Sequence, residues 1–149
     1  MHCELYYENI GYQFSEENIQ AIAEALQTIE PIPYQNLSIA FLAEKHICEI
    51  HQQFLNDPKP TDVITFPTDP EEGIGEICIS IEEAIKRSPQ FQQTLEQELL
   101  LYLVHGWLHL SHYDDIEPHD RELMRQAEQR LLTALAKQGL TLQVKKSNN

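Results

Sequence analysis

The segment at 91–110 constrains the fold more than any other part of the sequence. It follows a helix-start signal at Ser88 and Pro89, and its apolar residues are spread around the whole helical circumference. Such a helix is stable only when other elements surround it, so we predict a buried central helix. Its longest apolar run, from Leu99 to Val104, has six residues, far below the roughly 20 that span a membrane. The sequence therefore predicts a globular core and no membrane association.

Strand and helix patterns alternate before this segment. Short runs rich in β-branched and aromatic residues predict four strands, at 2–8, 37–42, 63–66 and 76–81. Helical periodicity predicts one helix after Ser15, a suitable N-cap, and a short helix through Ile47, Ile50 and Phe54. These patterns predict an α+β fold in which a small four-stranded sheet packs against helices.

A last helix is expected from Pro118 to Gly139, because proline favours the first position of a helix and glycine follows its end. Its predicted buried residues are Leu123, Ala127, Leu131 and Leu135. The chain of 149 residues has the length of one ordinary domain, and no segment has the composition of a linker. We predict one domain over residues 1–144 and a polar C-terminal tail over 145–149.

Acidic residues dominate the chain, with 24 Asp and Glu against 10 Lys and Arg, which gives a formal net charge of −14. The first 120 residues hold 22 of the acidic residues and 4 of the basic ones. Phosphate contacts are made by Lys and Arg, so this balance argues against extensive binding of nucleic acid. The N-terminus has neither a basic start nor an apolar stretch, so we expect a cytoplasmic protein without a secretory signal.

The end of the central helix carries a pattern typical of a metal site. His105 and His109 are four residues apart, so both imidazoles project from one helical face. Asp115 follows six residues later, where a chain that turns back can supply a third ligand. His112 and His119 are the alternative ligands. Two hydrogen-bonded core histidines without a metal remain a second interpretation of the pair.

Three protein ligands leave a fourth position for water, which is the arrangement of catalytic zinc sites. We therefore predict His105, His109 and Asp114 as catalytic residues, with Asp114 or His112 orienting that water or moving its proton. In a zinc peptidase the residue after the first histidine is the glutamate that acts as general base. Gly106 occupies that position here, which disfavours a metallopeptidase.

Three motifs resemble those of the YbeY-like rRNA maturation endoribonucleases. The segment H-G-W-L-H-L-S-H-Y-D-D at 105–115 is similar to the family's metal motif, H-G-x-L-H-L-x-G-Y-D-H. T-D-V-I-T-F-P at 61–67 and I-G-E-I-C-I-S at 74–80 resemble two further family signatures. Met124 and Glu128 match the family's M-x-x-x-E stretch. The motifs occur in the family's order and at the family's spacing.

The resemblance implies a mixed four-stranded sheet and a zinc ion held at positions 105, 109 and 115. It implies a zinc-dependent, single-strand-specific endoribonuclease that acts in 3′-end maturation of 16S rRNA and in ribosome quality control. The implied partners are rRNA in the small ribosomal subunit and ribosome-associated proteins. The alternative is a ribosome assembly factor of the same fold, with a structural metal and little nuclease activity.

Several positions depart from the family pattern. Asp115 replaces the third histidine, which keeps a divalent-metal ligand but weakens Lewis acidity at the metal. His112 replaces a glycine and would be strained if the backbone there requires a positive φ. His51 and Leu55 fall on the family's Asn and Arg, and Leu55 cannot grip a phosphate. We expect RNA to be contacted instead by these basic residues: Lys59, Arg121, Arg125 and Arg130.

Overall fold

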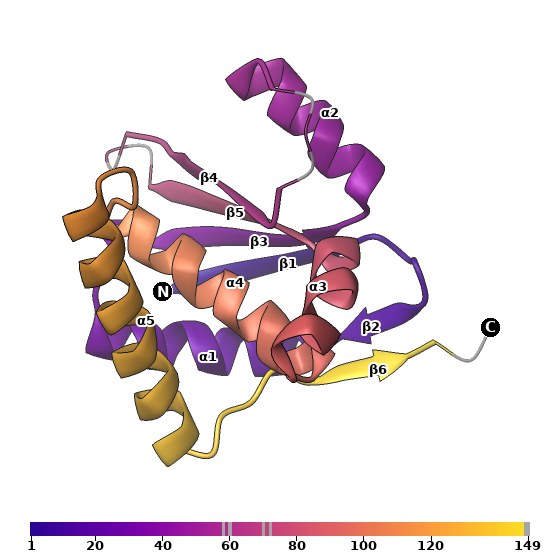
Figure 1. The fold of residues 1–149 in the computed structure, drawn as a ribbon. Coiled ribbons are helices and arrows are strands. Elements are labelled where there is room, and N and C mark those ends of the chain that lie inside the picture. The colour runs from indigo at the N-terminus through magenta and orange to yellow at the C-terminus, as the bar shows by residue number, and fades with distance from the viewer. Residues whose placement is uncertain (58, 60, 70, 72, 148–149) are drawn as a thin grey trace.

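The computed structural model describes residues 1–149 apart from 58, 60, 70, 72, 148 and 149 (Figure 1). The strands are β1 His2–Tyr7, β2 Tyr12–Phe14, β3 Asn36–Leu42, β4 Val63–Pro67, β5 Ile74–Ser80 and β6 Val144–Lys146. The α-helices are α1 Glu16–Ile29, α2 Glu44–Leu55, α3 Ile81–Arg87, α4 Leu95–Leu110 and α5 Pro118–Lys137. A 3-10 helix, η2, covers Ser88–Phe91 and continues α3.

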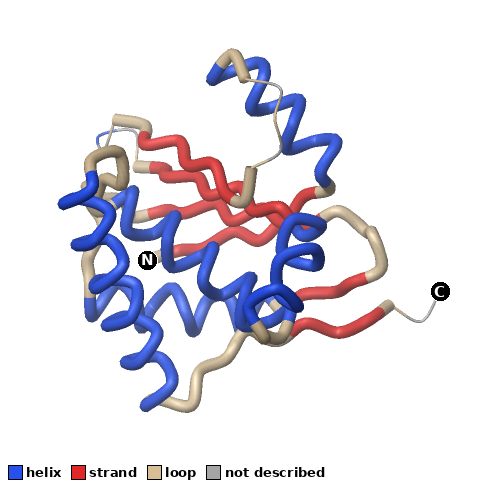
Figure 2. Tube along the Cα trace, viewed as in Figure 1, coloured by secondary structure: helices blue, strands red, loops and turns tan. Residues whose placement is uncertain are grey.

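The main sheet is mixed and four-stranded, in the order β1-β3-β5-β4. β1, β3 and β5 are parallel, and β4 pairs with β5 in the antiparallel direction. Helices connect the parallel strands, as such crossovers require. The structure therefore confirms a single α+β domain whose four-stranded sheet packs against helices (Figure 2).

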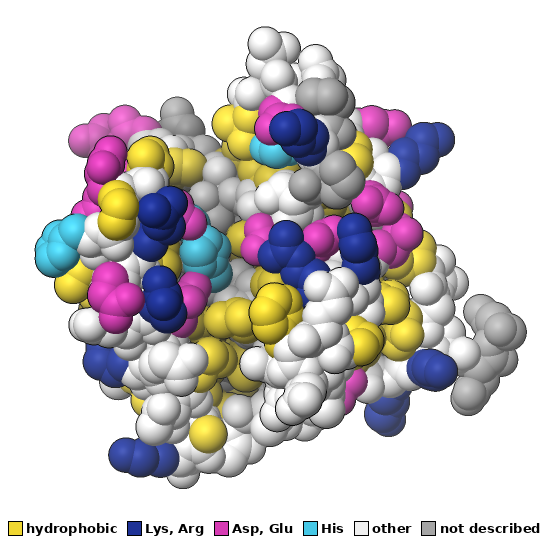
Figure 3. Space-filling model, in the orientation of Figure 1, with side chains coloured by type: hydrophobic (Ala, Val, Ile, Leu, Met, Phe, Trp, Pro, Cys, Tyr) yellow, Lys and Arg dark blue, Asp and Glu magenta, His cyan; other side chains and the backbone are white. Residues whose placement is uncertain are grey.

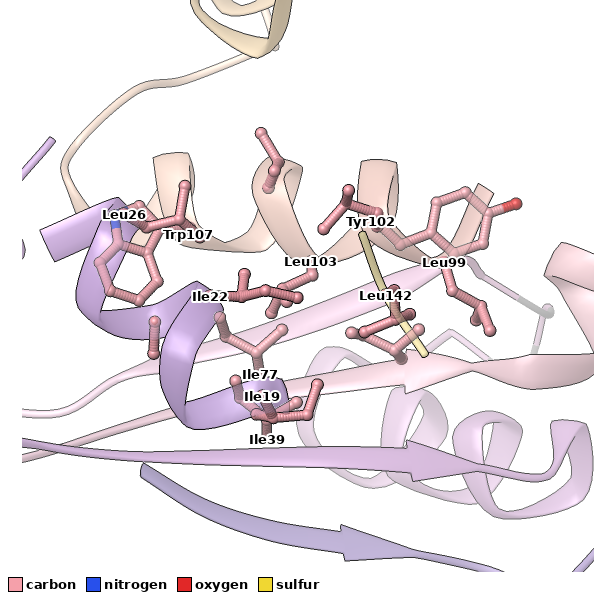
Figure 4. Packing of buried hydrophobic residues seen from close by; sticks show 14 of the residues in the cluster. Ile19, Ile22, Leu26, Ile39, Ile77, Leu99, Tyr102, Leu103, Trp107 and Leu142 are labelled. Carbon is pink, nitrogen blue, oxygen red and sulfur yellow. The ribbon is translucent and has the colours of Figure 1, made fainter. Parts of the chain in front are cut away.

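The two faces of the sheet carry separate apolar clusters, because side chains alternate along each strand. The larger cluster lies between the sheet and helices α1, α4 and α5, and the labelled isoleucines and leucines in Figure 4 belong to it. The smaller cluster lies on the other face and joins α2, through Ile47, to Leu42, Ile64 and Cys78 of the strands. α4 is therefore the central helix of the main core.

The buried helix begins later than its sequence pattern predicts. Ser88 and Pro89 belong to η2, and Phe91 is exposed, so the expected start near residue 91 is wrong. α4 begins at Leu95. The Thr94 side chain accepts a hydrogen bond from the backbone N–H of Gln97, and the Gln97 side chain accepts one from the backbone N–H of Thr94. This reciprocal capping box satisfies backbone donors of the first turn and fixes the helix start.

The C-terminal region differs from its prediction in two respects. Leu123 is 43% exposed, whereas its neighbour Met124 is buried, so the apolar stripe of α5 is rotated by one residue at this end. Val144–Lys146 forms β6, which pairs antiparallel with β2 in a small second sheet that the strand patterns missed. The predicted boundary at 144/145 thus falls inside a strand. None of the helices in the described ranges is long and apolar enough to cross a membrane.

Candidate metal centre

Three predicted ligands converge at the C-terminal end of α4. The Nε2 atoms of His105 and His109 lie 3.0 Å apart, since residues four apart in a helix are stacked on one face. Asp115 Oδ2 lies 3.2 Å from His105 Nε2 and 3.6 Å from His109 Nε2. The three side chains are partly buried, and their donor atoms all lie within 4.8 Å of one another. The side chains of His105, His109 and Asp115 keep 20%, 26% and 38% of their surface exposed, so solvent reaches the group.

The donor set fits a divalent metal ion of the zinc type. Zinc binds imidazole nitrogen and carboxylate oxygen at about 2.0–2.2 Å, and a tetrahedron of that size has edges of about 3.3–3.6 Å. The measured separations of 3.0, 3.2 and 3.6 Å lie close to these edges. Two imidazoles and one carboxylate are also a known ligand set for catalytic zinc. His105, His109 and Asp115 would therefore hold such an ion.

The loop after α4 brings Asp115 back to the helix. Tyr113 donates its backbone N–H to Leu108 O at 2.9 Å, and His112 donates to His109 O at 3.1 Å. This pair of bonds is a Schellman motif, which needs a left-handed residue where glycine is usual. His112 is that residue, with a φ of 76°. The helix therefore ends in a strained turn whose geometry fixes the return of the chain.

Asp114 holds the same loop through the backbone. Its Oδ1 accepts from the N–H of Asp115 at 2.7 Å and from that of Ile116 at 3.3 Å. These bonds orient Asp115 toward the histidines, and the catalytic role of Asp114 stays a prediction. The alternative ligands, His112 and His119, are exposed and do not belong to the converging group among the described residues.

Glu128 of α5 fixes the orientation of the first histidine. His105 Nδ1 lies 2.5 Å from Glu128 Oε2, and both side chains are largely buried. When Nδ1 donates to this carboxylate, Nε2 is left free to face the metal position. Burial of the ring lowers the pKa of His105, but the hydrogen bond and charge of Glu128, with smaller contributions from Asp62 and Asp115, raise it overall. Glu128 therefore acts as a positioning residue.

Gly106 allows α4 to lie close to the sheet. A Cβ atom at this position would lie 2.8 Å from Ile77 Cγ2, and 3.2 and 3.3 Å from methyl groups of Val63 and Thr65. The residue after His105 thus faces the strands, where no side chain fits. A glutamate base of the peptidase type has no room there, which further disfavours a metallopeptidase.

A cavity of about 250 Å³ adjoins the metal cluster and includes His105 and Glu128 in its wall. Arg87 of α3 also lines it, with Nε 2.8 Å from Glu83 Oε1 and Nη1 3.9 Å from Asp62 Oδ2. Asp62 additionally accepts from the N–H of Val63 at 2.8 Å, at the start of β4. Figure 3 shows this face hollowed, with a histidine at the edge of the hollow and basic side chains on both sides.

The predicted RNA-contact residues fall into two groups. Arg121 and Arg125 are exposed on α5. They precede Glu128 by seven and three residues, which places all three on one face of the helix. Arg130 instead pairs with Glu30 at 2.5 Å, so its expected phosphate contact is not supported. Lys59 is exposed, and its carbonyl accepts from His51 at 2.8 Å. Leu55, at the family's arginine position, is exposed at the end of α2.

The sequence patterns did not mark Glu128 as the partner of His105, nor Arg87, Glu98 and Tyr102 as residues that line the adjoining cavity. A signal for two of them was present, because Glu98, Tyr102, His105 and His109 share one face of an otherwise apolar helix. That polar stripe indicates a functional surface along α4 and not only at its end. Arg87 has no comparable signal, since its approach to Asp62 depends on the tertiary fold.

The chain is similar to known proteins along most of its length. A family model described as Endoribonuclease YbeY matches residues 5–136. An endoribonuclease YbeY from Protochlamydia amoebophila is 37% identical over 135 residues, which cover 87% of this chain and 90% of that protein. Another, from Acholeplasma laidlawii, is 36% identical over 126 residues, which cover 81% and 91%.

A solved structure has the same fold. The solution structure of TM1509 from Thermotoga maritima matches with a TM-score of 0.63 and 27% identity, over 91% of this chain and 90% of that one. The fold and the three sequence motifs of this chain thus agree with the family match. The chain belongs to the endoribonuclease YbeY family.

Proposed function

We propose that this protein is a metal-dependent, single-strand-specific endoribonuclease that acts in 3′-end maturation of 16S rRNA and in ribosome quality control. The observation that carries the proposal is the convergence of His105, His109 and Asp115 beside an open cavity in a member of this family. Zinc is the expected ion, because two imidazoles and a carboxylate suit it well. The expected place of action is the cytoplasm, on the small ribosomal subunit.

When bound by His105, His109 and Asp115, a divalent ion would supply Lewis acidity, which can polarise a phosphoryl oxygen and lower the pKa of water toward neutrality. Glu128 holds the His105 ring so that Nε2 faces the other two predicted ligands. Asp114 holds the loop that presents Asp115. Arg121 and Arg125, on the α5 face that carries Glu128, attract the phosphates of a strand lying over the cluster.

The charge distribution favours weak binding to free RNA. With few basic residues before residue 121, phosphate contacts depend on α5, and such contacts weaken as salt concentration rises. Specificity for rRNA then comes from the ribosome or from ribosome-associated proteins. Tight binding to naked RNA that does not change with salt would contradict this part of the proposal.

One purified sample tests the activity. The metal content is measured first, and then cleavage of a single-stranded RNA, its duplex and the matching DNA, each with and without chelator. His109→Ala should abolish chelator-sensitive cleavage of the single-stranded RNA. His2→Ala, which removes an exposed histidine at the beginning of β1, should leave it unchanged. Cleavage that resists the chelator, or that survives His109→Ala, would contradict the proposal.

The alternative is an assembly factor with a structural metal. Two observations favour it: Asp115 replaces a neutral ligand with an anionic one, and the charge of Arg87 is compensated by Glu83 and Asp62. A fully metal-loaded protein that cleaves none of the substrates would support this alternative. A gain of cleavage in the double variant Asp115→His and Leu55→Arg would then show that these two departures suppress the activity.

A further inference from the structure

One residue at the end of α1 contacts three elements that build the metal centre. Glu30 follows the last residue of α1, and Pro31 restricts it to a non-helical, extended conformation, with a φ of −141° and a ψ of 85°. Its carbonyl and its carboxylate accept hydrogen bonds from α4, from α5 and from the loop after α4. Together these elements carry the three predicted metal ligands and Glu128.

The contact with α4 is a hydrogen bond from a buried indole. Trp107 Nε1 donates to the Glu30 carbonyl oxygen at 2.7 Å, and the Trp107 side chain is fully buried. A buried indole N–H requires an acceptor, so this bond fixes the end of α1 against the turn of α4 that carries both histidines. Glu30 therefore has a defined position relative to His105 and His109.

The carboxylate of Glu30 joins the loop after α4 to α5. Its Oε1 accepts from Arg130 Nη2 at 2.5 Å, and the Tyr113 hydroxyl donates to the same oxygen at 3.4 Å. The hydrogen bond with Glu30 raises the pKa of Arg130, and a hydrogen bond with Tyr113 adds to this rise against the opposing effect of burial. Glu30, Tyr113 and Arg130 thus form one polar group, which we call the Glu30 cluster.

Tyr113 lies in the loop two residues before Asp115. Its backbone N–H closes the Schellman motif on Leu108 O, and its ring packs against the main core. The turn before it is strained, because His112 has a φ of 76°. Strained backbone persists only where the surrounding structure holds it. The bond from the Tyr113 hydroxyl to Glu30 supplies such a restraint just beyond the turn, on the path by which Asp115 returns to the histidines.

Arg130 connects the Glu30 cluster to the helix that carries Glu128. Residues two apart in an α-helix point about 200° apart, so Arg130 and Glu128 lie on nearly opposite sides of α5. One side contacts the end of α1, which α5 crosses in Figure 1, and the other contacts His105. Contacts on opposite sides oppose rotation of α5 about its axis, which keeps the Glu128 carboxylate at His105 Nδ1.

We propose that Glu30 is a positioning residue of the metal centre, which holds the loop of Asp115 and the rotation of α5 in the geometry that receives a divalent ion; the proposal rests on the metal-dependent function given above. A loop that leaves the histidines presents its ligand only part of the time. The apparent metal affinity then falls in proportion to the fraction of molecules in the competent form. Loss of the Glu30 cluster should therefore weaken metal binding although every ligand atom is retained.

Two variants disrupt the cluster and keep the shapes of the side chains. Glu30→Gln removes the charge, and Tyr113→Phe removes only the hydroxyl. Each should weaken zinc binding about three- to tenfold in a chelator competition, because a competent fraction of about 0.1–0.3 lowers affinity by this factor. The controls are Glu24→Gln, at an exposed position of α1, and Tyr6→Phe, which is 56% exposed on β1. Affinities of both variants within twofold of these controls would overturn the proposal.

The double variant tests whether the two side chains act as one unit. If Tyr113 acts through Glu30, combining Glu30→Gln with Tyr113→Phe should cost no more zinc affinity than the more damaging single change. Losses that multiply would show that the two side chains act independently, which would overturn the cluster as the source of the effect.

Hydrogen exchange of the metal-free protein separates positioning from overall stability. In Glu30→Gln, the amides of Tyr113 and Asp115, which are hydrogen-bonded within the loop, should exchange about tenfold or more faster, because the loop opens locally. Amides in the interior of α4 should keep their rates. An equal increase in the loop and in α4 would show that Glu30 only stabilises the whole fold, and would overturn the proposal.

RNA cleavage by the metal-loaded wild type distinguishes this proposal from the proposed function. A wild type that binds zinc and cleaves no RNA, together with weakened zinc binding in Glu30→Gln, keeps the role of Glu30 and overturns the endoribonuclease. A wild type that cleaves RNA, and whose zinc affinity and loop exchange equal those of Glu30→Gln, keeps the endoribonuclease and overturns the role of Glu30.

Discussion

Replacing Glu128 by glutamine should weaken metal binding by about 10- to 100-fold. The carboxylate lies 2.5 Å from His105 Nδ1 and its side chain is only 14% exposed, so water screens this contact poorly. A hydrogen bond to a charged group contributes about 1.5–3 kcal/mol, which corresponds to a factor of about 10 to 150 in affinity. Loss of comparable partners of metal-bound histidines costs about 10- to 100-fold, so two independent estimates agree.

The assay is a competition titration of zinc against a chromophoric chelator at neutral pH. Glu122→Gln is the matched control, because it removes the same charge from an exposed position of the same helix. Thermal unfolding of both metal-free variants establishes that the fold is retained. If the affinity of Glu128→Gln lies within twofold of that of Glu122→Gln, the carboxylate does not orient His105 as inferred here.

His112→Gly should raise the free energy of unfolding by about 0.5–1 kcal/mol, as measured by denaturant unfolding. Relief of the positive φ of 76° contributes about 1–2 kcal/mol, which exceeds the cost of about 0.4–1 kcal/mol from the greater chain entropy of glycine in the unfolded state. A tenfold loss of zinc affinity in this variant would instead identify His112 as a ligand. Gly106→Ala should lower the free energy of unfolding by about 1 kcal/mol. Overpacking against Ile77 costs about 1–3 kcal/mol, which outweighs the gain of about 1 kcal/mol in helix propensity. An unchanged midpoint of denaturant unfolding would show that α4 can shift. In the metal-free protein, pairing with Glu128 raises the pKa of His105 above its unfolded-state value of 6.5. The pairing therefore stabilises the folded protein fully below pH 6.5, and this stabilisation is lost as the pH rises through the folded-state pKa of His105. The difference in stability between wild type and Glu128→Gln should therefore be larger at pH 6 than at pH 9, and an equal difference at both values would contradict this pairing.

Much of the fold could be predicted because the decisive signals are local. The spacing of His105 and His109 places both rings on one face of any α-helix, and the turn after Leu110 is marked by the break in periodicity. The four strands of the main sheet are short apolar runs bounded by polar turns. By contrast, β2 and β6 lie 130 residues apart in the sequence and are stabilised by each other, so neither has a strong pattern of its own.

Local sequence patterns are enough to predict the mixture of helices and strands, the buried central helix and the donor types of the candidate metal centre. The approach of Asp115 to the two histidines depends on the folded chain, because a Schellman turn with a strained His112 sets the path of the loop. The tertiary structure also decides that Glu128 supports His105 and that Arg130 pairs with Glu30, since these contacts join elements far apart in the chain. Periodicity fixes which face a residue occupies, whereas the partner across that face depends on how the helices pack.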